Sequence, residues 1–522
     1  MSKIGNRVTA EWVKQSIILD NPATSRIYIS SLTSDPRGNV YAIGSFMGSA
    51  KIGDFPAIHS PNLVPFIIKL TQYGKIKYIT TAEIIIAQNK VSTNQKSNQM
   101  KRSCTNIINS SIDPGSQGYS ITVDDANNLF VTGSFLGILQ FKGVPPVINK
   151  QPGTMMFVAR FNANNGIPVW AIATYTDSDS EDTIALANAI TADTHNSLYI
   201  TGQFTGPINF ESKSINTKNT LDMFLTKIRK TDGKFIWVNQ SKEISDLDIE
   251  VVGNGLNLIS HCHKLIYVVG SFLNLAEFGD KITLETEAGL IDAYVIAADI
   301  RTGEWLSATQ TFSTTVDGIM GSAFGYGIVI SNADEIFITG YFNGKTTFGG
   351  NETYQNLTGA IATTYISKIK RHSNKYIWLD TVIVNPIAVS VAPGVVIFNV
   401  STGIIIDNSN KHIFVAGVFS GKYRCGDIEP INSTPNFASF IMRLNVEHKL
   451  KFVAVFQSVN LTDLSVVQFS LRQPIAINEC DTNTVYLGGL TQGDMRIGQL
   501  LIESPPPPGP YNFWISSLEF CP

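Results

Sequence analysis

The densest group of potential metal ligands in the chain is His261-Cys262-His263. Imidazole and thiolate are common ligands of Zn²⁺, which takes three or four of them in a tetrahedral arrangement. Successive residues of an extended chain point to opposite sides, so His261 and His263 could share one side. No C-x-x-C or H-E-x-x-H motif supplies further ligands. A surface turn is therefore favoured here, and a metal-binding histidine pair is the weaker alternative.

Two short acidic segments raise the question of calcium binding. Asp124-Asp125-Ala126-Asn127-Asn128 and Asp481-Thr482-Asn483 lack the spaced D-x-D-x-D-G pattern with a distal glutamate. Aspartate and asparagine side chains cap tight turns, so both segments are predicted to be Asx-turns. The chain also has no G-x-S-x-G motif, no phosphate-binding loop and only seven histidines. The sequence therefore predicts no catalytic residue set and no cofactor.

Two insertions carry the remaining candidate residues. Asn89–Thr105 is polar and basic, which is typical of a flexible surface loop; the alternative is a docking loop for an acidic partner. Ser504–Pro510 is a stiff polyproline II segment, expected to be a rigid connector; the alternative is a segment that enters an aromatic groove of a partner. The possible partner-contact residues are Lys90, Lys96, Lys101, Arg102, Pro505, Pro506, Pro507 and Pro508.

A repeated element has to position all of these residues. The phrase VYAIGSF (Val40–Phe46) recurs, for example as LFVTGSF (Leu129–Phe135) and IFITGYF (Ile336–Phe342), at intervals of roughly 70 residues. Glycine inside a strand costs stability, so its recurrence is predicted to reflect close packing, with a neighbouring aromatic ring in the place of the missing side chain. The recurring glycines are Gly44, Gly133, Gly202, Gly270, Gly340, Gly417 and Gly489.

Each unit has the pattern of four short antiparallel strands. An apolar run, a polar turn and the glycine phrase form a β-hairpin, as in Tyr119–Phe135. A short Phe-Gly element, a third apolar run such as Met223–Ile228 and a fourth run with an aromatic such as Trp237 follow. No segment shows sustained helical periodicity. Four strands repeated in this way predict an all-β, seven-bladed β-propeller.

The two ends of the chain are predicted to complete the same unit. The last unit stops at its third run, Phe513–Leu518, and the chain begins with Val8–Ile17, which reads like the fourth run Lys234–Ile244. Val8–Ser16 is expected to pair with Phe513–Leu518 and close the ring, because closure removes the unpaired edge. The chain is then a single domain, 1–522. Its parts are 1–19 (closing strand of blade 7), about 20–87 (blade 1), 88–110 (inserted basic loop), 111–180 (blade 2), 181–246 (blade 3), 247–316 (blade 4), 317–384 (blade 5), 385–459 (blade 6) and 460–522 (blade 7).

The repeat resembles the seven-bladed β-propeller-repeat proteins found mostly in bacteria, whose units read D-x-x-G-N-x-Y-V-T-G-x-F, G-T-x-x-F-G, D-x-F-V-x-K and G-x-x-x-W. The resemblance covers essentially the whole chain and implies the scaffold, without a common catalytic set. The closest matches are Asp35–Tyr41, Leu129–Gly143, Asp222–Lys227 and Gly233–Trp237. The aspartate nine residues before the glycine is replaced in four units, which argues against a repeated metal site. The replacements are His261, Ser331, Asn408 and Cys480.

Bulk composition excludes several classes of partner. A formal net charge of −3 predicts no nucleic-acid or anionic-membrane partner. No apolar run is long enough for a membrane span or a secretory signal. Five scattered cysteines do not form a disulfide framework. The compartment stays unknown, with an intracellular or virion-associated location preferred.

These features together predict a non-catalytic binding or structural scaffold. Its expected partners are a protein or further copies of itself, with a glycan as a second ligand class, in an assembly such as a virion or surface layer. The alternative is a hydrolase or lyase with its site at the central channel, where propeller enzymes have theirs. Convergent acidic, basic and histidine side chains in the channel would favour the enzyme.

Overall fold

The computed structural model describes most of the chain, and β-strands are its regular secondary structure there, as predicted. Among these residues there is no helix that could cross a membrane. The described residues are 8–21, 24–84, 115–217, 221–242, 250–259, 264–350, 352–356, 360–372, 375–387, 397–433, 437–460, 474–478, 481, 483–491, 493–503 and 512–520.

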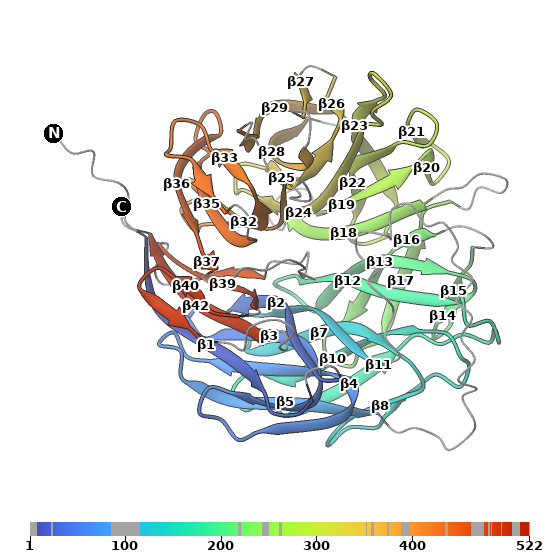
Figure 1. Ribbon diagram of the computed structural model, residues 1–522. Helices are drawn as coiled ribbons and strands as arrows, with labels where there is room; N and C mark the ends of the chain where they lie inside the picture. Colours follow the sequence, from blue (N-terminus) through green and yellow to red (C-terminus); the bar gives the residue numbers. More distant parts are fainter. Residues whose placement is uncertain are drawn as a thin grey trace.

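The structural unit is a group of four antiparallel strands. Within each group, each strand pairs with the next strand of that group, and the groups follow one another in chain order (Figure 1). We refer to the four strands of a group as its first to fourth strand and name each unit by its first strand. The groups are β2 (Arg26–Ser34), β3 (Val40–Ile52), β4 (Ile58–Leu70) and β5 (Ile76–Ile84); β6 (Gln117–Val123), β7 (Asn128–Phe135), β10 (Met155–Asn162) and β11 (Pro168–Ala173); β12 (Ile184–Ala192), β13 (Ser197–Thr205), β16 (Asp222–Arg229) and β17 (Phe235–Gln240); β18 (Glu250–Ile259), β19 (Leu265–Leu273), β22 (Ile291–Asp299) and β23 (Trp305–Thr314); β24 (Ser322–Ile330), β25 (Glu335–Asn343), β28 (Ala360–His372) and β29 (Lys375–Ile383); β31 (Ile397–Ile406), β32 (His412–Ser420), β35 (Ala438–Asn445) and β36 (Lys451–Gln457); and β38 (Ile475–Ile477), β39 (Thr484–Thr491), β42 (Asn512–Phe520) and β1 (Val8–Ile18).

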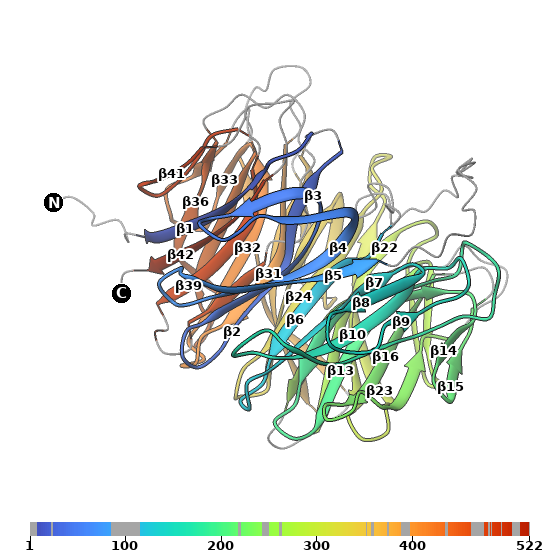
Figure 2. The ribbon, with the colours of Figure 1, turned by 90° about the horizontal axis from the view of Figure 1, so that it is seen from below.

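Strands from the two ends of the chain meet in the β38 unit. β1 pairs antiparallel with β42, and β42 pairs with β39. Ala10 lies opposite Leu518, and Gln15 lies opposite Trp514. The predicted pairing of the first strand in the chain with the last is therefore confirmed. Figure 2 shows the two strands side by side.

The recurring glycine stands opposite a β-bulge in the first strand. In β12 the extra residue is Asn188, and the first strands from β2 to β31 show the same register shift. The bulge brings the carbonyl oxygen of Leu186 to 1.8 Å from where a Cβ on Gly202 would lie. A Cβ on Gly133 would also lie 2.8 Å from the ring of Phe157. The predicted close packing is confirmed, but the backbone oxygen and the aromatic ring at Gly133 both belong to the glycine's own unit, and the oxygen lies closer than the ring.

Short links and apolar clusters join neighbouring units. The segment after the second strand contacts the end of the preceding unit, as where β8 (Ile138–Phe141) pairs with β5 and β26 (Lys345–Phe348) pairs with β23. The buried apolar side chains gather between units: Tyr486 of β39 clusters with Phe66 of β4, and Val329 of β24 clusters with Val415 of β32. The core is therefore divided among the unit interfaces, so each unit depends on its neighbours for burial.

Candidate functional site

The site residues predicted from the sequence all lie outside the described residues. They are His261, His263, Lys90, Lys96, Lys101, Arg102, Pro505, Pro506, Pro507 and Pro508. Their metal-binding and partner-contact roles stay predictions. In the part of the chain that the structure describes, no three or more His, Cys, Asp or Glu side chains form a group that could hold a metal ion.

The polar turns between first and second strands hold the recurring carboxylates. Asp124 Oδ1 accepts hydrogen bonds from the backbone N–H groups of Ala126 (3.1 Å) and Asn128 (2.9 Å). Asp481 Oδ1 accepts one from the N–H of Asn483 (3.1 Å). The predicted Asx-turns are confirmed at both places, because the carboxylates satisfy the backbone of their own turns.

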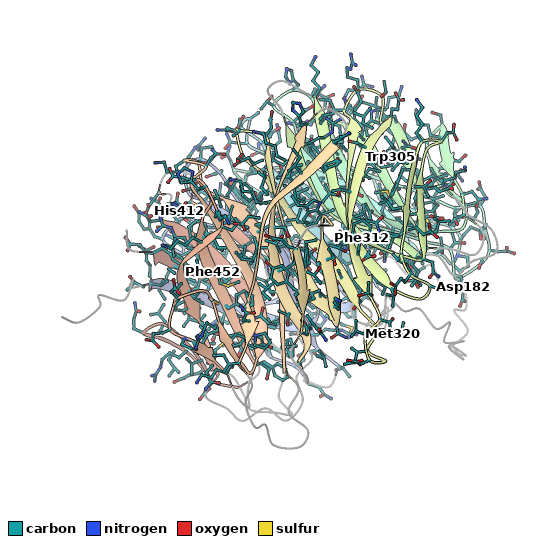
Figure 3. All side chains as sticks on the ribbon, turned by 90° about the horizontal axis from the view of Figure 1, so that it is seen from above. Asp182, Trp305, Phe312, Met320, His412 and Phe452 are labelled. Carbon is teal, nitrogen blue, oxygen red and sulfur yellow. The ribbon has the colours of Figure 1, made fainter. Side chains whose placement is uncertain are left out.

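In the β31 unit the residue that caps the turn is Asp407. Counting nine residues back from Gly417 gave Asn408, so the prediction that this unit lacks the aspartate was wrong by one residue. This turn is one residue longer, and Asp407 Oδ1 accepts from the N–H groups of Lys411 (2.9 Å) and His412 (3.1 Å). Burial opposes ionisation of Asp407, but hydrogen bonds from Ser409, His412 and Lys411 outweigh it and lower the pKa of this carboxyl. Figure 3 labels His412.

A basic side chain on the third strand reaches from several units to the next. Each acceptor is a carbonyl oxygen in the turn between the third and fourth strands of the following unit, so these side chains hold neighbouring units together. The bonds are Lys69 Nζ to Ala163 O (2.9 Å), Arg160 Nη1 to Lys230 O and Thr231 O (both 3.4 Å), Lys227 Nζ to Ile300 O (2.9 Å) and Lys368 Nζ to Val446 O (2.8 Å).

The aromatic side chain of the fourth strand contacts the same turn. Trp170 Nε1 donates to the carbonyl oxygen of Lys230 (3.0 Å), as the Tyr78 hydroxyl does to Ala163 (3.2 Å). These turns contain glycines with positive φ, whose missing side chains leave room for the ring.

The N-terminal strand β1 makes the same contact to the β2 unit. Trp12 Nε1 donates to the carbonyl oxygen of Gln72 (2.7 Å), and a Cβ on Gly74 would lie 2.6 Å from the Trp12 ring. For comparison, a Cβ on Gly303 would lie 2.8 Å from the ring of Trp237. β1 therefore acts toward the β2 unit as a fourth strand.

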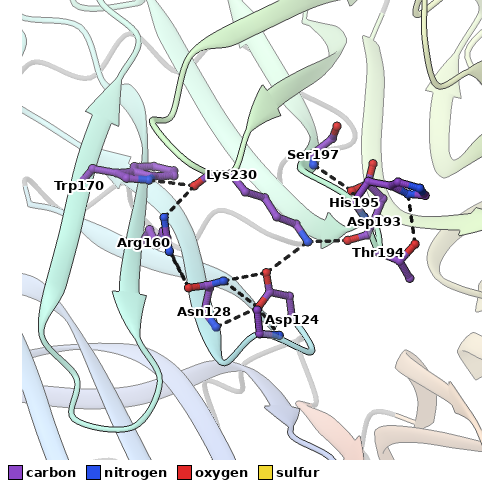
Figure 4. Close-up of polar contacts among 10 residues, drawn as sticks. Asp124, Asn128, Arg160, Trp170, Asp193, Thr194, His195, Ser197 and Lys230 are labelled. Carbon is purple, nitrogen blue, oxygen red and sulfur yellow. Dashed lines mark hydrogen bonds and ion pairs between the residues drawn. The ribbon is translucent and has the colours of Figure 1, made fainter.

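The most extensive polar network lies between the β6 and β12 units (Figure 4). Lys230 Nζ is 3.3 Å from Asp124 Oδ2, with 7% and 9% of the two side chains exposed, and it also donates to the carbonyl oxygen of Asp193. Arg160 donates to Asn128 Oδ1 through Nε (3.2 Å) and Nη2 (2.7 Å). The buried cation thus has a carboxylate and a carbonyl as partners, as a buried charge requires.

The hydrogen bonds of these lysines, and not their electrostatics, decide what they do. Burial lowers the pKa of Lys69 and of Lys227, while Asp35 and Asp193 respectively oppose the shift. A lysine with a lowered pKa can act as a base or nucleophile where its Nζ meets a substrate. Here each Nζ donates to a carbonyl of the next unit. The arrangement joins units, and the amines are not presented to a ligand.

The first strands contact one another from unit to unit and carry few acid–base groups. On the described residues of the first strands, Arg26 and Glu250 are the only Asp, Glu, His, Lys or Arg residues. The bulge residue Asn188 donates through Nδ2 to the carbonyl oxygen of Gly253 (3.0 Å), and Asn254 makes the same type of bond to the β24 unit. At these two bulges a neutral amide connects the neighbouring first strands.

Sequence reasoning missed the third-strand cations as a set. The third run of these units has an aromatic residue that lies opposite the recurring glycine, and the basic residue follows this aromatic residue by three positions. The matching segments are Phe66–Lys69, Phe157–Arg160, Phe224–Lys227, Tyr365–Lys368 and Phe440–Arg443.

Comparisons with known proteins leave the family open. No protein-family model matches the chain. No curated protein matches it. A structure of a protein of unknown function from Dyadobacter fermentans is 9% identical, with a TM-score of 0.39 over 98% of this chain and 99% of that chain. Quinohemoprotein alcohol dehydrogenase ADHIIG from Pseudomonas putida HK5 is 8% identical, with a TM-score of 0.40 over 100% and 78%. The WD40 domain of SCAP from fission yeast is 10% identical, with a TM-score of 0.29 over 99% and 98%. Likenesses this weak assign no function to this chain.

Proposed function

We propose that the chain is a non-catalytic binding scaffold that presents its outer strands and loops to a protein partner. The observation that carries this proposal is the chemistry of the first strands, whose described residues include only Arg26 and Glu250 as charged groups. A central active site needs convergent acid, base or nucleophilic side chains. The polar groups at the bulges are neutral, and the buried lysines are bonded to backbone carbonyls.

We also propose that the units form seven blades closed by β1, with the boundaries given by the repeat. The contacts between first strands run from β2 through β6, β12, β18, β24, β31 and β38 and back to β2. On the outer side, Ser16 of β1 pairs with Ile52 of β3. The contact of Trp12 with Gly74 matches those between other neighbouring units. The resemblance to the seven-bladed β-propeller-repeat proteins agrees with this arrangement.

The fourth strands supply the surface proposed for the partner. Ile377 and Leu379 on β29 are 50% and 43% exposed. Phe312 on β23, which Figure 3 labels, is 46% exposed. Among the described strands, β29 pairs with β28 alone and is an edge strand, whereas β23 also pairs with β26. Exposed apolar side chains, above all at a sheet edge, are typical of protein contact surfaces. The partner is a second protein or a further copy of this chain.

Affinity capture from the native source tests the proposal. The full chain is the bait, and it is compared with an Ile377→Ser/Leu379→Ser double variant. Tyr73→Ser is the control, because Tyr73 is a large exposed side chain (77% exposed) that lies in a turn and not on a fourth strand. The full chain and the control are expected to retain a partner, or to self-associate in sedimentation, and the double variant to lose it. Turnover of a small substrate without any macromolecular partner would overturn the scaffold.

A further inference from the structure

The interface between the β24 and β31 units differs from the repeat at the end of the fourth strand. In most other units a hydroxyl side chain there accepts a hydrogen bond from the third-strand backbone, whereas the β2 unit has Ala82 at this position. In the β24 unit this position holds Val384. The N–H of Val384 donates to the carbonyl oxygen of Thr364, just as the N–H of Ser241 donates to the carbonyl oxygen of Met223 in the β12 unit. The hydroxyl bonds elsewhere are Met156 N to Thr174 Oγ1, Met223 N to Ser241 Oγ, Ala293 N to Thr311 Oγ1 and Ser439 N to Ser458 Oγ.

Two further positions of this interface carry polar side chains, and at the first of them four other units have apolar ones. Asn399 lies opposite Phe419 on the neighbouring strand. The equivalent partners of a second-strand phenylalanine in other units are Ile27, Ala185, Val251 and Ala323. On β33 (Lys422–Arg424), the ring of Tyr423 lies 5.9 Å from the ring of Phe419. Asn399 and Tyr423 therefore flank the same aromatic ring.

These polar groups are buried and have no hydrogen-bond partner among the residues that the structure describes. Thr364 Oγ1, both amide atoms of Asn399 and the hydroxyl of Tyr423 are unpaired, and each residue is 0% exposed. Burial raises the pKa of Tyr423, so its phenol keeps its proton and needs an acceptor. Buried polar groups in folded proteins are almost always paired, so four unpaired atoms in one interface call for a ligand.

The three side chains lie on surfaces that face each other. Ala362 of β28 is the parallel partner of Phe398 in β31, so the strands that carry Thr364 and Asn399 lie side by side where the two units meet. Ile366, which lies on the same side of β28 as Thr364, packs in one apolar cluster with Val384, Phe419 and Tyr423. The polar atoms are therefore enclosed in an apolar interface.

The geometry points to an internal hydration site between the β24 and β31 units, in which ordered water bridges Thr364, Asn399 and Tyr423. The three groups are uncharged and their surroundings are apolar, which excludes an ion as ligand. They offer donors and acceptors together, and water satisfies both. The inference is independent of the proposed partner surface.

A high-resolution crystal structure tests the site directly. The expected result is solvent density about 3 Å from the Asn399 amide and from Thr364 Oγ1 or the Tyr423 hydroxyl. Direct pairing of these atoms with protein groups, or an interface without solvent density, would overturn it.

Conservative variants test the site in solution. Thr364→Val and Tyr423→Phe each remove one polar atom and keep the shape of the side chain. Each is expected to lower the urea midpoint, and the double variant to lower it by less than the sum, because both groups hold the same water. Thr132→Val is the matched control, since it removes a direct bond from a buried threonine to the Phe157 carbonyl (2.8 Å), and its effect should add to that of Thr364→Val. A raised midpoint in the single variants, or strict additivity in the double variant, would contradict the bridging water.

Discussion

Asp292 is a buried carboxyl at the start of the third strand of the β18 unit. Its Oδ1 accepts hydrogen bonds from the Thr311 hydroxyl (2.9 Å) and the Ser313 N–H (2.8 Å). Burial raises its pKa to about 6, and these hydrogen bonds only partly oppose the shift. The carboxyl therefore binds its proton more tightly in the folded than in the unfolded protein. The stability linked to the protonated form is fully present below pH 3.8 and is lost as the pH rises through about 6.

Asp292→Asn should remove this pH dependence. Relative to the variant, the wild-type protein is expected to lose about 3 kcal/mol of unfolding free energy between pH ~3 and ~7. Urea unfolding at a series of pH values measures the difference. Parallel profiles for the two proteins would show that the carboxyl is not desolvated.

Gly202 should tolerate no side chain. A Cβ there would lie 1.8 Å from the carbonyl oxygen of Leu186, and a backbone oxygen in a paired strand cannot move aside. Gly202→Ala is expected to cost more than about 3 kcal/mol of unfolding free energy. Gly137→Ala is the control, because its φ is +75° but no atom lies within 4 Å, so only backbone strain of about 1 kcal/mol applies. Equal losses in the two variants would contradict the steric argument.

Between elements, the ion pair of Lys230 and Asp124 joins two neighbouring units. Lys230 lies in the turn between the third and fourth strands of the β12 unit, and Asp124 lies in the turn between the first and second strands of the β6 unit. Lys230→Met leaves Asp124 buried without its cation, which should cost about 3 kcal/mol. Adding Asp124→Asn keeps the turn cap and removes the charge, so the double variant should regain most of the loss. Chemical denaturation of both proteins measures the coupling. A double variant as unstable as the sum of its single changes would show that the pair is not coupled.

The strand pattern could be predicted from the sequence because alternation and turn residues are local signals. The glycine phrase of each second strand and the cap at Asp124 were predicted for this reason. The cap at Asp407 was missed because a one-residue insertion changes the spacing without changing the composition. The bulge at Asn188 adds a residue that the apolar pattern does not mark. The acceptor of Lys69 lies in the next unit, and no local pattern identifies it.

At the scale of the whole molecule, Trp12 should matter as much as the fourth-strand aromatics inside the chain. Trp12→Ala removes its contact with Gly74 and its bond to Gln72 and is expected to cost about 2 kcal/mol, less than for a fully buried tryptophan. Trp170→Ala, which removes the equivalent bond to Lys230, should cost a similar amount. Thermal unfolding of both variants makes the comparison. A stable Trp12 variant beside an unstable Trp170 variant would show that β1 does not act as a fourth strand.

The closed ring is the premise of the scaffold proposal, because it gives the first strands a common centre and leaves the fourth strands outside. Deletion of residues 1–18 removes β1, and with it the partner of β42 and the contact of Trp12 with the β2 unit. The truncated protein is expected to aggregate or to lose its cooperative melting transition, because an open sheet edge and an uncovered core remain. A peptide of residues 8–18 should restore the transition. A monomeric truncated protein with an unchanged melting temperature would contradict the closed ring.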